Sequence, residues 1–258
     1  MTLLRVTRIG KAFDGFRALD DVSFEVDAGE MVALIGPNGA GKSTCFNVLN
    51  GQLKPDAGSI VFDDEEVAGL APRTIWRKGI ARTFQIAATF ALLSAIENVQ
   101  VALASREREL HRWWKPLSAL HRDEAIDLLD RVGMASEAER TCGVLAYGDV
   151  KRVELAIALA SRPRLLLMDE PTAGMSVTER AALMTLVKQL VIDSRLAVLF
   201  TEHSMDAVFG YANRVIVMAR GRVIAAGAPD AIRHDAQVNE VYFGAGSLWG
   251  EVRDEALP

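Results

Sequence analysis

The apolar residues of this chain follow two different periods, and the period changes along its length. Val22, Phe24 and Val26 alternate with polar residues, which is the pattern of a strand with one buried face. Residues 31–35 form a short apolar run that leads into glycines, and residues 59–62 form another after a turn signal. The beginning of the chain is therefore predicted to be rich in strands.

A helical period replaces this alternation in the middle of the chain. Strand signals fade from about residue 87 to residue 160, where Ala125, Leu129 and Val132 fall on one helical face. Gly133 follows and suits the left-handed end of a helix. We therefore expect a helical insert between two regions that contain strands.

Short apolar strands return in the last third of the chain. They cover residues 165–168, 197–201 and 215–218, with helical stretches such as 177–191 between them. Strands that alternate with helices predict a parallel sheet of an α/β fold. No repeat or evident linker interrupts the 258 residues, so we expect the parts to pack together.

Charge and composition limit the classes of function. A formal net charge of −5 argues against general attraction to nucleic acid, and the start of the chain has no pattern of an export signal. No run approaches the roughly 18 apolar residues that cross a bilayer. Cys45 and Cys142 are too few for a disulfide framework and lack metal-ligand spacing, so we expect two buried thiols in a reducing cytosol.

One glycine-rich segment carries a specific chemistry. It follows a predicted strand, precedes a helical segment and matches the phosphate-loop pattern with Gly36, Pro37, Asn38, Gly39, Ala40, Gly41, Lys42, Ser43 and Thr44. Its glycines let backbone N–H groups surround phosphate oxygens, while Lys42 supplies a cation and the Ser43 hydroxyl suits Mg²⁺. This combination predicts a site for a nucleoside triphosphate.

Two carboxylates extend this chemistry from binding to hydrolysis. Asp169 and Glu170 end the apolar run that begins at Leu165. A core strand alone would not require two acids at its carboxyl edge. We expect Asp169 to hold Mg²⁺ through water and Glu170 to polarise an attacking water.

These segments, in this order, resemble the ATP-binding subunit of an ABC transporter, and more narrowly the type that serves branched-chain amino acid importers. The resemblance covers essentially the whole chain. Besides the phosphate loop and the Asp169-Glu170 strand, it rests on residues 82–85 (Arg-Thr-Phe-Gln), 145–148 (Leu-Ala-Tyr-Gly) and 201–203 (Thr-Glu-His). It implies an ATPase with a RecA-like P-loop NTPase core and parallel sheet, an antiparallel β subdomain and an inserted helical subdomain.

The resemblance also implies roles for individual residues. Gln85 matches the glutamine that touches Mg²⁺ and the attacking water, and His203 matches the histidine that contacts the γ-phosphate. Phe13 matches the aromatic residue that stacks on adenine, although an ordinary apolar position in a strand or turn is the alternative. A single domain over residues 1–258 is expected, with residues 1–86 and 161–258 as the core and β subdomain and 87–160 as the helical subdomain.

The segment matching the family signature departs from its usual form, Leu-Ser-Gly-Gly-Gln. It reads Leu145, Ala146, Tyr147, Gly148 and Asp149, so that only the leucine and the second glycine match. We expect it to bind the γ-phosphate of a nucleotide held by the opposite subunit, through backbone N–H groups and helix potential. Asp149 suits the start of a helix dipole, and Lys151 or Arg152 would have to compensate its charge near a triphosphate.

By the same resemblance, the partners are a second ATP-binding subunit, membrane-spanning permease subunits and, indirectly, a periplasmic or extracellular substrate-binding protein. The chain is expected peripherally at the cytoplasmic face of the inner membrane, with ATP and Mg²⁺ as cofactors and no nucleic acid partner. An importer of urea or short amides is a close alternative. A soluble ABC-type ATPase acting on nucleic acid, and a small-molecule kinase or GTPase, are the more distant ones.

Overall fold

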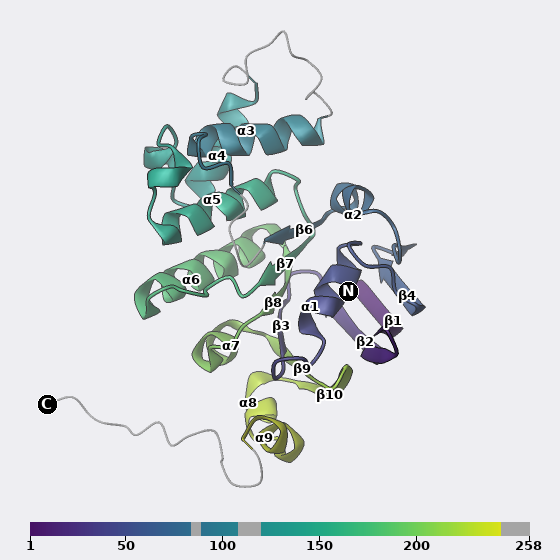
Figure 1. The fold of residues 1–258 in the computed structure, drawn as a ribbon. Coiled ribbons are helices and arrows are strands. Elements are labelled where there is room, and N and C mark those ends of the chain that lie inside the picture. Colours follow the sequence, from purple (N-terminus) through teal and green to yellow (C-terminus); the bar gives the residue numbers. More distant parts are fainter. Residues whose placement is uncertain (84–88, 108–119, 244–258) are drawn as a thin grey trace, which may run out of the picture.

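The computed structural model describes residues 1–83, 89–107 and 120–243, which form two sheets with helices around them (Figure 1). One sheet has six strands in the order β10 (Arg222–Gly227), β9 (Arg214–Ala219), β3 (Met31–Ile35), β8 (Ala197–Thr201), β7 (Leu165–Asp169) and β6 (Ile80–Thr83). The other has four, in the order β2 (Phe16–Asp27), β1 (Thr2–Phe13), β4 (Ala57–Phe62) and β5 (Glu65–Glu66).

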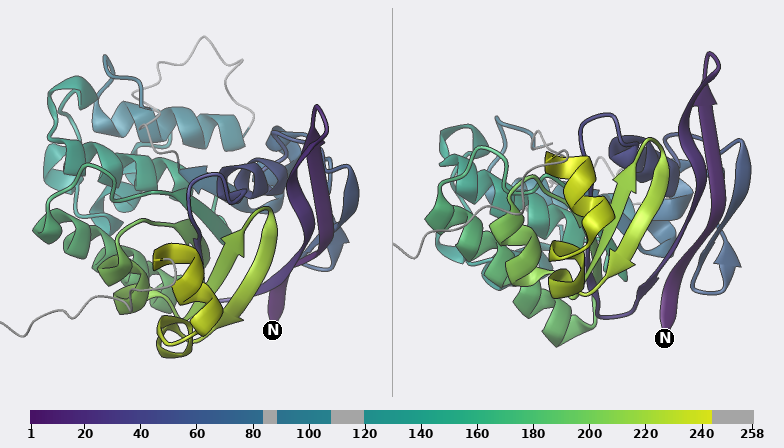
Figure 2. Two further views of the ribbon diagram at one scale, coloured as in Figure 1. Left: turned by 60° about the horizontal axis from the view of Figure 1, so that its bottom comes forward. Right: turned by 90° about the horizontal axis from the view of Figure 1, so that it is seen from below.

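The helices divide between the two sides of the six-stranded sheet. Helices α3 (Ala95–Arg106), α4 (Arg122–Arg131), α5 (Tyr147–Leu159) and α6 (Val177–Ser194) lie on one side in Figure 1. Helices α1 (Lys42–Leu49) and α2 (Pro72–Lys78) lie toward the four-stranded sheet. Helices α7 (Met205–Tyr211), α8 (Pro229–Arg233) and α9 (Ala236–Phe243) follow in the last part of the chain, and α8 and α9 pack against β10 (Figure 2).

All strand pairs of the six-stranded sheet are parallel except the edge pair β9–β10. Alternate residues of its strands enter two different cores: Met31, Ala33 and Ile35 face the helices α3–α6, whereas Val32 and Leu34 face α1 and the four-stranded sheet. Both faces of the sheet are therefore covered, which explains why these strands are continuous apolar runs rather than alternating ones.

The predicted fold class is confirmed: the chain combines a parallel α/β sheet with an antiparallel sheet and helices. The strands predicted at 31–35 and 197–201 match β3 and β8, and the helix predicted to end at Gly133 is α4. Gly133 has φ 73°, its N–H bonds to the carbonyl of Asp130, and the N–H of Met134 bonds to that of Leu129. This pair of bonds is a Schellman motif, which satisfies the last carbonyls of the helix.

Strand β1 was not anticipated, because its side chains do not alternate regularly. Its pairing with β2 shifts register several times, and Arg8 lies in the left-handed region at φ 52°. Each shift places two successive residues on one face, as with the buried neighbours Leu3 and Leu4. A chain with such bulges escapes a search for period two.

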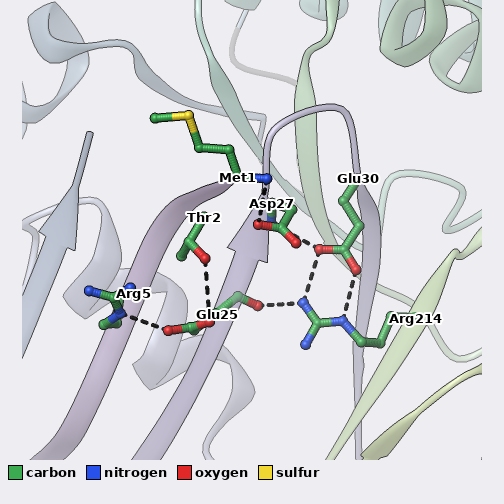
Figure 3. Close-up of polar contacts among 7 residues, drawn as sticks. All are labelled: Met1, Thr2, Arg5, Glu25, Asp27, Glu30 and Arg214. Atoms are coloured by element: carbon green, nitrogen blue, oxygen red, sulfur yellow. Dashed lines mark hydrogen bonds and ion pairs between the residues drawn. The ribbon is translucent and has the colours of Figure 1, made fainter. Parts of the chain in front are cut away.

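An ion-pair network fastens the four-stranded sheet to the six-stranded one (Figure 3). Arg214, the first residue of β9, donates from Nε and Nη2 to the two carboxylate oxygens of Glu30 at 2.8 and 2.9 Å. Its Nη2 also donates to the backbone carbonyl of Glu25 in β2 at 2.7 Å. Glu30 holds the pKa of the Arg214 guanidinium above its usual value, as a two-point hydrogen-bonded pair should.

The structure bears on two expectations, those for the two cysteines and for membrane-spanning segments. Cys45 and Cys142 are both buried and free. Burial raises the pKa of the Cys45 thiol to about 12. Among the described residues, no helix has the length and apolar character that spanning a membrane requires.

Candidate nucleotide-binding and hydrolysis site

The phosphate loop begins where β3 ends, at the centre of the parallel sheet. Residues 36–41 form the turn, and α1 starts at Lys42. The loop closes on itself through the N–H of Ala40, which bonds to the carbonyl of Pro37 at 3.1 Å. Its outer side rests on the turn between β9 and β10, where the N–H of Gly221 donates to the carbonyl of Ala40 at 3.0 Å.

Two glycines of this loop leave no room for a side chain. A Cβ added at Gly36 would lie 2.2 Å from the carbonyl oxygen of Met218, and one at Gly41 would lie 2.5 Å from that of Ala18. Gly41 also has φ 103°, a conformation that other residues rarely adopt. The packing of the neighbouring strands therefore requires glycine at both positions.

Lys42 lies buried at the start of α1, with its ammonium directed back over the loop. Its Nζ donates to the carbonyls of Gly36 at 2.6 Å and Pro37 at 3.2 Å. Burial lowers the pKa of this ammonium, and the charges of Glu170 and Asp169 act in the opposite direction. The Ser43 hydroxyl beside it is exposed. A cation and an exposed serine thus lie at the first turn of a helix, where the helix dipole also favours anions.

The structure brings Asp169 to the same edge of the sheet, because β7 runs parallel to β8 and β8 to β3. Oδ1 of Asp169 accepts from the Thr201 hydroxyl at 2.9 Å, and Oδ2 accepts from Arg82 Nη2 at 2.7 Å. Both side chains of the Arg82–Asp169 pair are largely buried. The carboxylate is therefore held from both sides, by the ends of β8 and β6.

Glu170 and His203 meet across the ends of β7 and β8. The distance between Glu170 Oε1 and His203 Nε2 is 2.9 Å. Glu170 has φ 47°, a left-handed conformation, and its N–H bonds to the carbonyl and the hydroxyl of Thr201 at 3.1 and 3.0 Å. A non-glycine residue with φ > 0 is uncommon and marks a position that its surroundings impose. Here that conformation directs a carboxylate toward an imidazole.

The signature segment lies at the start of α5, which packs against α3, α4 and α6. Helix α5 begins at Tyr147, with Ala146 extended before it and no side chain capping its first N–H groups. Asp149 lies in the first turn, two residues after the first residue of the helix. Its carboxylate is therefore well placed for the helix dipole. A Cβ added at Gly174 would lie 3.8 Å from the Tyr147 ring, so this segment adjoins the loop after Glu170.

The two cations that follow Asp149 in the sequence, Lys151 and Arg152, both contact acceptors of the helical region. Lys151 Nζ pairs with Glu154 Oε2 at 3.0 Å, and both side chains are almost fully buried. Arg152 Nη1 points to the carbonyl of Val132 at 3.5 Å. Both cations thus have acceptors in the helical region, and compensation of the Asp149 charge near a triphosphate stays a prediction.

Phe13 ends β1 and is 42% exposed, directly opposite Phe16, which is 66% exposed. Of this pair, Phe16 lines a hollow of about 710 Å³ together with Pro37, Asn38 and Gly39 of the phosphate loop. The hairpin thus offers two aromatic faces where one was expected. Gln85 lies outside the described residues.

Comparisons with known proteins identify the family. Residues 19–173 match the family model described as ABC transporter. The chain is 35% identical to BraF, a high-affinity branched-chain amino acid transport ATP-binding protein of Pseudomonas aeruginosa, over 94% of this chain and 98% of BraF. It is also 35% identical to LptB, a lipopolysaccharide export system ATP-binding protein of Escherichia coli, over 95% of this chain and 98% of LptB. The chain belongs to the ABC transporter family.

Solved structures of this family agree with the fold. The ADP conformation of MJ1267, an ATP-binding cassette of an ABC transporter, superposes with a TM-score of 0.84 at 31% identity, covering 95% of this chain and 99% of MJ1267. The cassette MJ0796, a dimer bound to ADP and Pi in a post-hydrolysis state, gives 0.74 at 25% identity, covering 88% of this chain and 98% of MJ0796. As a member of the ABC transporter family, the chain is an ATP-binding subunit with ATPase activity.

Some residues of the ABC transporter site had no role assigned from the sequence. Thr201 and Arg82 hold Asp169, and Glu202 accepts from Thr172 and His203. Thr201, Glu202 and Arg82 lie in segments that carry the family resemblance, but their contacts depend on which strands are neighbours. The order of strands β3, β8, β7 and β6 supplies that information, and no local pattern in the sequence does.

Proposed function

We propose that this chain hydrolyses ATP for an importer of branched-chain or related amino acids, and that Glu170 is its general base. The observation that carries the hydrolytic role is the 2.9 Å contact between Glu170 and His203 at the strand edge shared with the phosphate loop. A carboxylate held in this place can orient a water or take its proton, while His203 and Lys42 stabilise charge on the transferred phosphoryl group.

The donor atoms of this site fit a magnesium ion. Mg²⁺ prefers hard oxygen ligands, and it is commonly held by one or two carboxylates together with phosphate oxygens and water. Ser43 offers an exposed hydroxyl and Asp169 offers a positioned carboxylate. We assign these two residues to Mg²⁺, together with Gln85 by resemblance. The ion would neutralise charge on the β- and γ-phosphates.

We further propose that the phosphate loop and the signature of one chain serve two different nucleotides. Helix α1 packs between β2 and β7, whereas α5 packs in the helical region formed with α3 and α4. Two subunits arranged head to tail would join each loop to the partner's signature, and the dimeric form of the MJ0796 cassette supports such pairing. Motion of residues 87–160 as a helical subdomain would then transmit closure to permease subunits at the cytoplasmic face of the membrane.

Substitution of Glu170 by Gln tests the hydrolytic role. This change keeps size and hydrogen bonding but removes the base, so we expect ATP hydrolysis to fall by about 10²–10⁴-fold. ATP binding should stay within about threefold. Glu65→Gln, at the exposed strand β5 beside Lys78, is the matched control and should keep full activity. Normal turnover by the Glu170 variant would remove Glu170 from the role of base.

The class of transported substrate has to be determined with the complete transporter. Similarity to BraF supports branched-chain amino acids as the transported substrates. A substrate-binding protein, which is only an indirect partner of this chain, would then deliver them to the permease subunits. The equal identity to LptB keeps an export role as the second candidate. The chain should be assembled with its membrane subunits, and uptake of labelled leucine and of urea into vesicles should be measured. Leucine uptake supports the proposal; uptake of urea alone points to the alternative importer, and absence of any uptake to export.

A further inference from the structure

A buried carboxylate, Glu202, lies between β8 and the proposed γ-phosphate contact His203. Only 5% of Glu202 is exposed. Its Oε1 accepts from both the N–H and the hydroxyl of Thr172, at 2.9 and 2.6 Å. Its Oε2 accepts from the N–H of His203 at 3.2 Å.

Such a group is costly unless its charge is compensated by donors. Removing a carboxylate from water without partners costs several kcal/mol, so a buried one must be held by hydrogen bonds or by cations. The three bonds to Glu202 come from two segments: Thr172 in the loop that follows β7, and His203 in the loop that follows β8. The carboxylate therefore joins these two segments.

The first segment carries Glu170. Thr172 is 2% exposed, and it shares a tight turn with its neighbours: the N–H of Ala173 bonds to the carbonyl of Glu170, and that of Met175 to the carbonyl of Thr172, both at 3.1 Å. A bond that fixes Thr172 therefore also limits the backbone of Glu170, which already has the unusual φ of 47°. Glu202 thus limits the backbone of Glu170 through Thr172, which lies two residues after Glu170.

The second segment carries His203, whose side chain is 54% exposed. An imidazole so open to water has few packing contacts to fix it, so its direction depends on its backbone and on its contact with Glu170. Glu202 binds the backbone N–H of His203. The same carboxylate is thus bonded to the backbone of both segments whose side chains meet at 2.9 Å.

The strands themselves do not require this link. Strands β7 and β8 are already paired in register from Leu165↔Ala197 to Asp169↔Thr201. Glu202 and Thr172 lie beyond the last of these pairs, where the chains separate into loops. A carboxylate placed there adds order to the loops rather than to the sheet.

We propose that Glu202 is a positioning residue for ATP hydrolysis, which aligns Glu170 and His203 by holding Thr172 and the His203 backbone together. The inference rests on the proposed function, since it presumes that Glu170 and His203 act on the γ-phosphate. It extends the site to a buried residue that would act through its hydrogen bonds to Thr172 and His203.

The first test is Glu202→Gln in the full-length chain. The amide oxygen can keep both bonds to Thr172, but an NH₂ group then faces the N–H of His203, and the two donors repel. We expect kcat for ATP to fall at least tenfold, while KM and the dissociation constant for ATP stay within twofold. Thr172→Val removes only the hydroxyl bond and should lower kcat by a smaller factor, near threefold.

A double-mutant comparison separates positioning from general stability. In a His203→Ala background, Glu202→Gln should lower kcat by less than twofold, because Gln keeps the bonds to Thr172 that hold the Glu170 segment, and the side chain aligned by the lost bond is already absent. If the double variant lost kcat by the product of the two single-variant factors, the two changes would be independent and the proposal would be overturned. So would a kcat of Glu202→Gln within twofold of the parent, or equal losses in kcat, ATP affinity and melting temperature. If Glu170→Gln also hydrolyses ATP normally, the proposed function fails; if only Glu202→Gln does, this inference alone fails.

Discussion

Two helix starts in this chain face phosphate in the proposed mechanism, and they are built in opposite ways. Helix α1 follows a glycine loop, places Lys42 at its first position and has no acidic residue in its first turn. Helix α5 follows an extended alanine and has Asp149 in its first turn. Neither has a side-chain cap on its first N–H groups. Both helices therefore offer the same dipole, with charges of opposite sign beside it.

This difference gives the two helix starts different roles: α1 can bind phosphate, and α5 can detect that a nucleotide site is complete. The start of α1 carries its own cation and a rigid cradle, so it can bind a phosphate anion by itself. The start of α5 carries an anion, so it should bind phosphate only where a partner's lysine and Mg²⁺ already neutralise the charge. A signature with weak intrinsic affinity would respond to a completed nucleotide site and to little else.

A pair of glycine substitutions should give the largest contrast between the two helix starts. Gly36→Ala places a Cβ 2.2 Å from the Met218 carbonyl, so it should abolish nucleotide binding and cost about 2 kcal/mol or more of unfolding free energy. Gly148→Ala places one 3.3 Å from a carboxylate oxygen at the end of the Glu179 side chain and should change stability by less than about 1 kcal/mol. Thermal denaturation and binding of a fluorescent ATP analogue measure both. Equal losses would mean that the loop is not the more constrained site.

Removal of the phosphate-loop cation should come next in size. Lys42→Ala should weaken ATP binding by about 10–100-fold, since hydrogen bonds from a charged group contribute about 1.5–3 kcal/mol. Lys188→Ala, on the exposed face of α6, is the matched control and should bind ATP as the parent does. Titration with ATP by isothermal calorimetry reports both. An unchanged affinity of the Lys42 variant would show that the loop backbone alone holds the phosphates.

Asp149→Gln should have the smallest effect. Loss of its interaction with the α5 dipole costs about 0.5 kcal/mol, and the ATPase rate of the assembled transporter should change by less than about threefold. The measurement needs the assembled form, because the signature is proposed to act in trans. A severe loss of activity would give the carboxylate a positive role and would make α5 more than a source of helix potential.

Much of the fold could be predicted from the sequence, because buried parallel strands have continuous apolar runs. Strands β3 and β8 were recognised in this way, and helix α6 was recognised as a helical stretch between two such runs. Strand β6 has only four residues and lies at a sheet edge, so its sequence is too short to be distinguished from a loop or a piece of helix. Helix α2 did carry signals, with Pro72 at its first turn and Gly79 at its end with φ 103°. Strand β6 is therefore too short for pattern reading and the bulged strand β1 too irregular, whereas both ends of α2 are marked in the sequence.

The site was predictable one residue at a time and not as a constellation. Lys42, Asp169 and Glu170 each lie at the end of an element whose sequence announces it. The bonds from Thr201 to Asp169 and from Thr172 to Glu202 join residues 32 and 30 positions apart. They exist only because β7 and β8 are neighbours, and sheet order is a property of the whole fold. The assigned roles of these residues stay predictions until the variants above are measured.

The burial of both thiols makes this protein convenient for spectroscopy. Cys45 and Cys142 are the chain's two cysteines, and neither is exposed to a labelling reagent. A thiol whose pKa is raised to about 12 has almost no thiolate at neutral pH, so maleimides and nitroxide reagents should leave Cys45 unmodified. A single cysteine introduced at Val144, which is 66% exposed beside the signature, would then carry the only label. Distances between two such labels could follow the approach of one subunit to another without prior removal of native cysteines.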